Sequence, residues 1–143
     1  MTSFSLDSHF AGVMGDLLGP EFPDEIGLAV SGGGDSMALL TLAHNWTRHM
    51  GVGLRVVTVD HGLRPESGAE AALVAAECAA LGHRHDVLRW QGWDGTGNLQ
   101  DRARRARYSL MTDWAKANGI EVIALGHTAD DQAETFLMRL SRE

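Results

Sequence analysis

Short apolar runs alternate along the chain with longer segments whose apolar residues recur at helical spacing. Strands are predicted where the runs are rich in apolar and β-branched residues or alternate apolar with polar ones, at 26–30, 54–60, 84–90 and 120–125. Helices are predicted over 7–18, from Asp35 or Ser36 to about Met50, over 67–81, over 98–118 and from about Ala129. Because strands separated by helices form parallel βαβ units, the pattern predicts an α/β fold, a doubly wound parallel sheet with helices on both faces.

The C-terminal end departs from this alternation. The chain stops at Glu143, directly after the last predicted helix, and no strand follows that helix. A doubly wound sheet normally continues each crossover helix into a further strand. We therefore expect residues 1–143 to form one domain that is incomplete at its C-terminus and lacks its last strand.

Composition narrows the class of protein. Hydrophobic residues make up 44% and charged residues 22% of the chain, as in soluble globular proteins, and no apolar run is long enough to span a membrane. The N-terminus lacks a signal-peptide pattern, and the single cysteine, Cys78, excludes a disulfide scaffold or a cysteine-rich metal site. These features predict a cytoplasmic location. The net charge of -7, taken alone, argues against a protein that coats nucleic acid.

Three segments at the ends of predicted strands contain the residues that could bind a ligand or take part in catalysis. They are residues 31–36, 60–67 and 126–134. In open α/β sheets, ligands bind outside the carboxyl ends of the strands. We therefore expect all three segments to lie at that one edge of the sheet.

The first segment, Ser31-Gly32-Gly33-Gly34-Asp35-Ser36, has the composition of an anion cradle. Consecutive glycines let backbone N–H groups turn toward one point, and the next helix N-terminus and two hydroxyls add further donors. The segment lacks the Gly-Lys-[Ser/Thr] of a Walker A motif and the Gly-x-Gly-x-x-Gly of dinucleotide-binding folds. An ordinary glycine-rich turn has the same composition, but the position directly after a buried strand favours phosphate binding.

The third segment gathers Asp130, Asp131 and Glu134 in the first turns of the last predicted helix, where Asp130 and Glu134 would share a face. Carboxylates at that position could simply cap the helix. Mg²⁺, however, takes hard oxygen ligands that it shares with phosphates, so a metal role is also open. His127 could be a metal ligand, an acid–base group or a hydrogen-bonding residue at the strand end.

The second segment and the long predicted helix add further polar residues. Asp60 and His61 form an acid–histidine pair in what could be only a polar connection. The arginines of the 98–118 helix cannot all share one face at helical spacing; they are Arg102, Arg104, Arg105 and Arg107. One or two of them could clamp the charge that develops on a phosphate, while the others solvate the surface.

Four motifs, in order along residues 26–140, resemble those of one enzyme family. Residues 31–36 are similar to the SGGxDS signature of the PP-loop ATP pyrophosphatases. Residues 59–67 (VDHGLRPES) resemble the VDHGLRxES segment of the tRNA(Ile)-lysidine synthetases, and residues 103–108 (ARRARY) resemble their ARxxRY helix. Residues 125–135 resemble the LGHxxDDQxET motif of the same family. By this resemblance, residues 1–143 correspond to the family's N-terminal PP-loop ATP-binding catalytic domain, without its C-terminal tRNA-binding domains.

The resemblance implies a reaction and its partners. The family uses ATP to attach AMP to the wobble cytidine of an isoleucine tRNA with a CAU anticodon, and lysine then displaces the AMP. The implied partners are therefore that tRNA and lysine, with no membrane, and a homodimer is left open. Gln100 stands where the family often has an acid before its arginine helix, so lysine recognition is left open as well.

The resemblance also assigns roles to single residues. ATP would be bound by the residues of the glycine-rich segment and the strand end beside it: Ser31, Gly32, Gly33, Gly34, Asp35, Ser36, Asp60 and His61. Mg²⁺ would be coordinated near Asp35 and Asp131, and Arg104 would stabilise charge on the α-phosphate. The remaining candidates, which would bind or deprotonate the lysine amine, are His127, Asp130 and Glu134.

Two other interpretations are kept open. A tRNA thiolase of the same superfamily commonly needs paired cysteines, and this chain has only Cys78. A non-catalytic ATP-binding module would need no acid–base groups beside the phosphates. The acidic residues of segment 126–134 therefore favour an enzyme over such a module.

Overall fold

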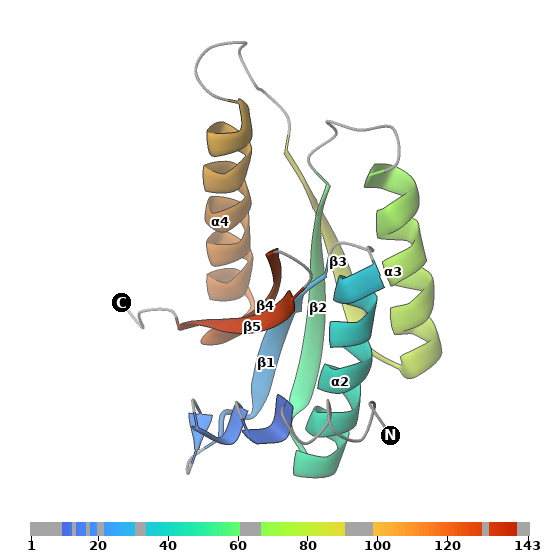
Figure 1. The fold of residues 1–143 in the computed structure, drawn as a ribbon, viewed down its shortest axis with the longest axis vertical. Helices are drawn as coiled ribbons and strands as arrows, with labels where there is room; N and C mark the ends of the chain where they lie inside the picture. The colour runs from blue at the N-terminus through green and yellow to red at the C-terminus, as the bar shows by residue number, and fades with distance from the viewer. Residues whose placement is uncertain are drawn as a thin grey trace.

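Five strands form one sheet in the order β3-β2-β1-β4-β5 (Figure 1). The computed structural model describes residues 10–12, 14–16, 18–19, 22–30, 34–60, 67–90, 99–129 and 132–139. The strands are β1 (Glu25–Ala29), β2 (Gly53–Asp60), β3 (Arg84–Arg89), β4 (Val122–Ala129) and β5 (Gln132–Arg139). β1 pairs in parallel with β2 and with β4, and β2 pairs in parallel with β3. The predicted parallel arrangement of these four strands is confirmed.

The parallel strands are joined by the helices α2 (Gly34–Met50), α3 (Ser67–Leu81) and α4 (Leu99–Ala117). Their ends lie within about two residues of the predicted ends. Gly82 and Gly119, just beyond the ends of α3 and α4, have φ of 83° and 69°, the left-handed conformation that ends many helices. Described residues between Phe10 and Leu18 are also helical, as predicted. Within the described part of the chain, no helix is long and apolar enough to cross a bilayer.

The core lies on both faces of the sheet, because successive side chains of a strand point to opposite sides. Leu28 of β1 and Val56 of β2 are fully buried against α2 and α3. Their neighbours Ala29 and Val57 are buried on the other side, against α4. The helices therefore cover both faces, as predicted, with α2 and α3 on one side and α4 on the other (Figure 1).

The direction of winding explains this division of the helices. The connections through α2 and α3 step from β1 to β2 and from β2 to β3, in one direction across the sheet. The connection through α4 returns past β2 and β1 to β4 on the far side. Right-handed crossovers that run in opposite directions place their helices on opposite faces. The winding therefore reverses between β1 and β4, which are neighbours in the sheet.

The last element corrects the sequence-based prediction of a helix from Ala129. Residues Gln132–Arg139 form β5, which pairs antiparallel with β4 from Ala129↔Gln132 to Val122↔Arg139. This pairing gives hydrogen-bond partners to the edge of β4 that faces away from β1, which would otherwise be a free sheet edge. Because Glu134 lies in a strand, the helical face predicted for Asp130 and Glu134 does not exist.

Candidate active site

The carboxyl ends of β1, β2 and β4 meet at one edge of the sheet, as the sequence predicts. The end of β1 pairs with Val57 on one side and with Leu125 on the other, both opposite Ala29. From that level β2 continues to Asp60 and β4 continues to Ala129. β1 is therefore shorter at this edge than both of its neighbours, and α2 begins only a few residues after β1.

The start of α2 lies at the point where the winding reverses. Gly34, Asp35 and Ser36 are the first residues of α2, so their backbone forms its first turn. The first turn of a helix has N–H groups without helical partners and carries the positive end of the helix dipole, which together favour an anion. Ligands of open α/β sheets bind at such a reversal point. Ser31, Gly32 and Gly33 lie outside the described residues.

Asp60 is the last residue of β2 and borders the same edge. Its carbonyl accepts a hydrogen bond of 3.0 Å from the backbone N–H of Trp90, which holds the ends of β2 and β3 together. His61 lies outside the described residues. The structure therefore gives the position of only one member of the predicted acid–histidine pair, Asp60.

β4 and β5 bring two of the predicted residues together in the backbone. His127 and Glu134 are directly paired across the antiparallel ladder. From residue 132 on, this strand pairing stands where the sequence predicts the first turns of a helix. Asp130 and Asp131 lie outside the described residues.

Arg104 lies on the exposed side of α4, and its guanidinium carbon is 5.8 Å from the centroid of the Tyr108 ring, one helical turn further on. Cation–π contacts at exposed sites are weak, on the order of 0.5–1 kcal/mol. Arg102 and Arg105 are also exposed, whereas Arg107 is half-buried. The arginines therefore do not share one face, as the helical spacing predicts.

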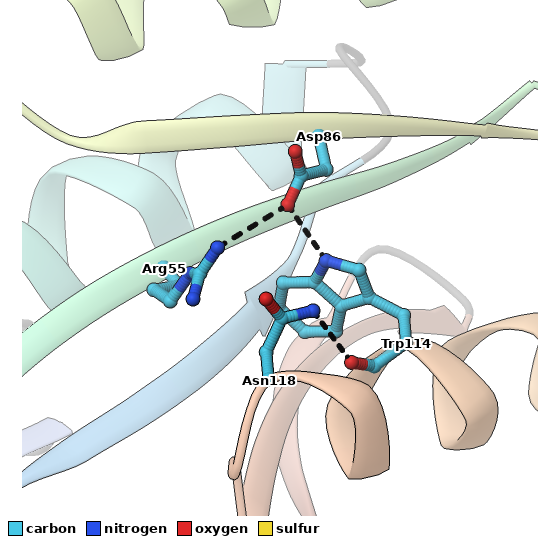
Figure 2. A network of polar contacts seen from close by, with 4 residues as sticks. All are labelled: Arg55, Asp86, Trp114 and Asn118. Carbon is cyan, nitrogen blue, oxygen red and sulfur yellow. Dashed lines mark hydrogen bonds and ion pairs between the residues drawn. The ribbon is translucent and has the colours of Figure 1, made fainter.

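A polar network that the sequence analysis did not find holds α4 against the sheet (Figure 2). The indole N–H of Trp114 donates a 2.7 Å hydrogen bond to Oδ2 of Asp86, and the side-chain amide of Asn118 donates one of 2.7 Å to the Trp114 carbonyl. The same carboxylate oxygen is 3.7 Å from a terminal guanidinium nitrogen of Arg55. The network thereby links α4 to β2 and β3.

One residue in this region, Gly27, is recognisable in the sequence as an unusual choice for a buried strand. Gly27 lies inside the apolar run of β1, where a larger side chain would normally contribute to the core. A Cβ at Gly27 would stand 3.1 Å from Cζ3 of Trp114 and 3.3 Å from side-chain atoms of Ile120 and Ile123. A glycine in a strand often marks the close approach of another group, and here that group is the Trp114 indole.

Comparison with known proteins decides the family. The model of the PP-loop domain matches residues 6–143. The chain belongs to the PP-loop family of ATP-binding domains. Its doubly wound sheet, with a helix N-terminus at the reversal point, is what such a PP-loop domain requires to bind a phosphate chain.

Relatives of this PP-loop domain include two curated tRNA(Ile)-lysidine synthases. The one from Ruegeria pomeroyi is 61% identical over 120 residues, which cover 84% of this chain and 29% of the relative. The one from Hyphomonas neptunium is 51% identical over 114 residues, which cover 80% of this chain and 30% of the relative. The PP-loop domain thus spans about 30% of the length of the curated relatives that it matches.

A solved structure supports the same fold at low sequence identity. The U34-tRNA thiolase NcsA from Methanococcus maripaludis, which carries a [4Fe-4S] cluster, superposes with a TM-score of 0.69. It is 18% identical, and the match covers 87% of this chain and 46% of the thiolase. At this identity the likeness concerns the PP-loop fold alone.

Proposed function

We propose that this chain is the ATP-binding part of a tRNA(Ile)-lysidine synthase, which joins lysine to the wobble cytidine of tRNA(Ile). The observation that carries the proposal is the 61% identity to the Ruegeria pomeroyi enzyme over 84% of the chain. The reversal of winding beside the start of α2 supports ATP as the ligand, because backbone N–H groups there can hold a phosphate chain.

The proposed reaction has two steps. The O2 atom of the cytosine attacks the α-phosphate of ATP, the bond to the β-phosphate breaks, and pyrophosphate leaves. The neutral ε-amine of lysine then attacks C2 of the adenylated cytidine, and AMP leaves with the electron pair of the C2–O bond. The attacking nitrogen gives up one proton as the C2–N bond forms, so a base is needed within hydrogen-bond reach.

In this proposal the glycine-rich segment around Ser31 and the first turn of α2 bind the phosphates of ATP. Asp60, at the end of β2, faces the adenosine side together with His61. Arg104 stabilises the charge that builds up on the α-phosphate, where a positive group acts most strongly in the transition state. The groups that bind the lysine amine and take its proton are proposed to be His127, Asp130 and Glu134.

Mg²⁺ fits the donor types at this edge. Asp35 and Asp131 would hold it, because carboxylate oxygens are the ligands that Mg²⁺ prefers beside substrate phosphates. Within the described part of the chain, no three His, Cys, Asp or Glu side chains form a metal cluster, and Asp131 lies outside that part. Phosphate oxygens of the substrate would share the coordination with these carboxylates. When bound, the ion would neutralise negative charge on the phosphate chain.

A thiolase activity is less well supported. The only cysteine, Cys78, is fully buried in α3, and burial raises the pKa of its thiol to about 11. Thiolates, not thiols, bind clusters and carry sulfur. A protonated, buried thiol remote from the carboxyl edge of the sheet suits neither role.

ATP binding is tested by calorimetry of the chain with ATP and Mg²⁺. Asp35→Ala should abolish the binding heat, because it removes a carboxylate proposed to hold the metal at the phosphates. Asp113→Ala, an exposed acid on α4, is the matched control and should bind as the unchanged chain does. An unchanged affinity in Asp35→Ala would refute the assignment of this site.

Lysine ligation is tested in a chimera. The matching 120-residue segment of the Ruegeria pomeroyi enzyme is replaced by the corresponding segment of this chain. The chimera should release pyrophosphate from ATP only when both lysine and tRNA(Ile) with a CAU anticodon are present. Release with a different acceptor, and none with this tRNA, would exclude lysidine formation.

A further inference from the structure

A cavity of about 480 Å³ opens at the amino edge of the sheet, at the opposite end of the strands from the candidate active site. Its walls are the C-terminal parts of α2 and α3 and the first residues of β1, β2 and β3. Ligand cavities in proteins typically measure about 300–1,000 Å³. The cavity is therefore large enough for a small ligand and distinct from the ATP site.

Basic side chains outnumber acidic ones around this cavity. Arg48 of α2 and Arg84 of β3 line it, and neither has an ion-pair partner among the described residues. Glu25 is the one carboxylate in the lining. Arg55 also contributes to the wall, but its guanidinium already pairs with Asp86. Two exposed arginines that form no ion pair within the described part of the chain indicate a place where an anion is favoured.

The C-termini of α2 and α3 lie at the cavity and offset part of this positive charge. A helix C-terminus carries about half a negative charge, and a basic residue in the last turn, such as Arg48, partly offsets it. Two carbonyls near these ends are already occupied by backbone N–H groups. Val52 donates to Thr47 and His83 donates to Cys78, each over 2.9 Å. Arg48 is therefore not needed as a hydrogen-bond donor to those carbonyls.

A pair of histidines lines the same cavity. Nδ1 of His44 and Nε2 of His83 are 2.8 Å apart, so one proton lies between the two rings. In the neutral pair, one of the two remaining ring nitrogens carries a proton and the other is bare. A single added proton fills the bare nitrogen without breaking the mutual bond. The pair then carries one positive charge and offers two free N–H donors.

Without an anion, this protonation is disfavoured. Burial lowers the pKa of His83, and the nearby His44 lowers it further. The charged groups that line the cavity from the other elements are Glu25 of β1, Arg48 of α2, Arg55 of β2 and Arg84 of β3. The three arginines oppose a positive charge on the histidine pair, whereas an anion between the arginines and the histidines would offset that repulsion.

We infer that this cavity is a second ligand site, which binds a phosphate-class oxyanion between Arg48, Arg84 and the His44–His83 pair and takes up one proton as it does so. The ligand chemistry is a tetrahedral oxyanion, from free phosphate or from the phosphate backbone of an RNA. The site does not depend on the proposed enzyme activity, because it lies at the other edge of the sheet.

Sulfate is a suitable probe, because it remains a dianion over the whole pH range in which histidines titrate. The ring resonances of His44 and His83 are followed by nuclear magnetic resonance while sulfate is titrated into the chain at constant ionic strength. We expect saturable shifts of both rings and an affinity that is higher at pH about 6 than at pH about 8. Sulfate bound at residues 31–36 would leave these two rings unchanged, so the two sites are distinguished.

Three variants separate the contributions. The double variant Arg48→Ala, Arg84→Ala should weaken sulfate binding about tenfold or more, because charge-assisted contacts are lost. The double variant His44→Gln, His83→Gln should remove the pH dependence while the arginine contribution remains. Lys116→Ala removes an exposed positive charge from α4 and should leave binding unchanged. The inference is overturned if the rings do not respond, or if the double arginine variant binds sulfate as tightly as the unchanged chain.

The source of the oxyanion is decided by competition. Inorganic phosphate and a short single-stranded RNA are each added to the sulfate-loaded chain. Displacement by both, with RNA the stronger competitor, identifies an RNA backbone contact, whereas displacement by phosphate alone identifies a site for the free ion. If neither displaces sulfate, the assignment to the phosphate class is wrong.

Discussion

Trp114 donates its indole N–H to Asp86 over 2.7 Å and thereby ties the last turn of α4 to β3 (Figure 2). Trp114 is 7% exposed, so most of its ring also packs in the cluster under α4. The same helix carries Arg104 about ten residues earlier. The bond is therefore part of what sets the position of the arginine-bearing helix over the sheet.

Trp114→Phe should destabilise the chain. The substitution keeps an aromatic ring in the core but leaves the Asp86 carboxylate without its donor, which costs about 1–3 kcal/mol. Urea unfolding should show a lower midpoint with an unchanged slope. Asp86→Asn, which retains an acceptor oxygen, should cost less than Trp114→Phe. Equal losses in both variants would mean that the charge of Asp86, which also faces Arg55, contributes more than its hydrogen bond from Trp114.

Gly27→Ala should destabilise the chain by about 1–3 kcal/mol, because a Cβ there would overpack the core. The new atom would stand 3.1 Å from the Trp114 ring and 3.3 Å from Ile120 and Ile123. Gly68→Ala is the matched control: nothing lies within 4 Å of the added Cβ, and alanine is the better helix former by up to about 1 kcal/mol. The two substitutions should thus change the free energy of unfolding in opposite directions. A neutral Gly27→Ala would contradict the close packing of the indole.

The buried thiol of Cys78 should make stability fall at high pH. Burial, with a smaller contribution from Glu77, raises its pKa from 9.0 to about 11 in the folded chain. The folded state therefore keeps a proton that the unfolded state loses, and the stabilisation is lost as pH rises from 9.0 to about 11. Cys78→Ala should flatten this part of the stability curve, measured by urea unfolding at each pH. In the unchanged chain the thiol should resist alkylation until the protein unfolds.

Two histidines should make stability fall in mild acid. Burial lowers the pKa of His83 and of His85 below the ordinary value of 6.5, although Asp86 partly opposes this for His85. The unfolded chain then binds protons that the folded chain does not, so stability is lost as pH falls below 6.5. His85→Gln should reduce this loss while retaining a polar partner for Thr58, whose Oγ1 lies 2.8 Å from Nε2 of His85. If the slope of stability against pH is the same in His85→Gln, another group is responsible.

β5 should be visible as a strand in solution. The Cα and Cβ chemical shifts of residues 132–139 should be those of extended backbone, because these residues pair with β4 over its full length. Strong exchange protection of alternate amides should accompany them, since a β-ladder engages every second N–H group of an edge strand. Chemical shifts typical of a helix in residues 132–139 would instead support the helix that the sequence pattern predicts from about Ala129.

Several parts of the fold were predictable because they depend on local patterns. The apolar run that became β1 and the glycine that ends α3 at Gly82 each act through the backbone of a few neighbouring residues. The edge at which the candidate site lies was predictable for a similar reason, because the carboxyl ends of parallel strands face the same edge of the sheet. The role of residues 31–33 and of Asp130 and Asp131 stays a prediction, since these lie outside the described residues.

The sequence by itself determined the α/β alternation and the PP-loop family, because these follow from periodicity and from contiguous motifs. Only the tertiary structure decided that Gln132–Arg139 pairs as a strand, that Gly27 makes room for Trp114, and that His44 meets His83. Each of these depends on residues that are far apart in the chain or on an exposed sheet edge. Local propensity has no information about such partners, and so it could not predict them.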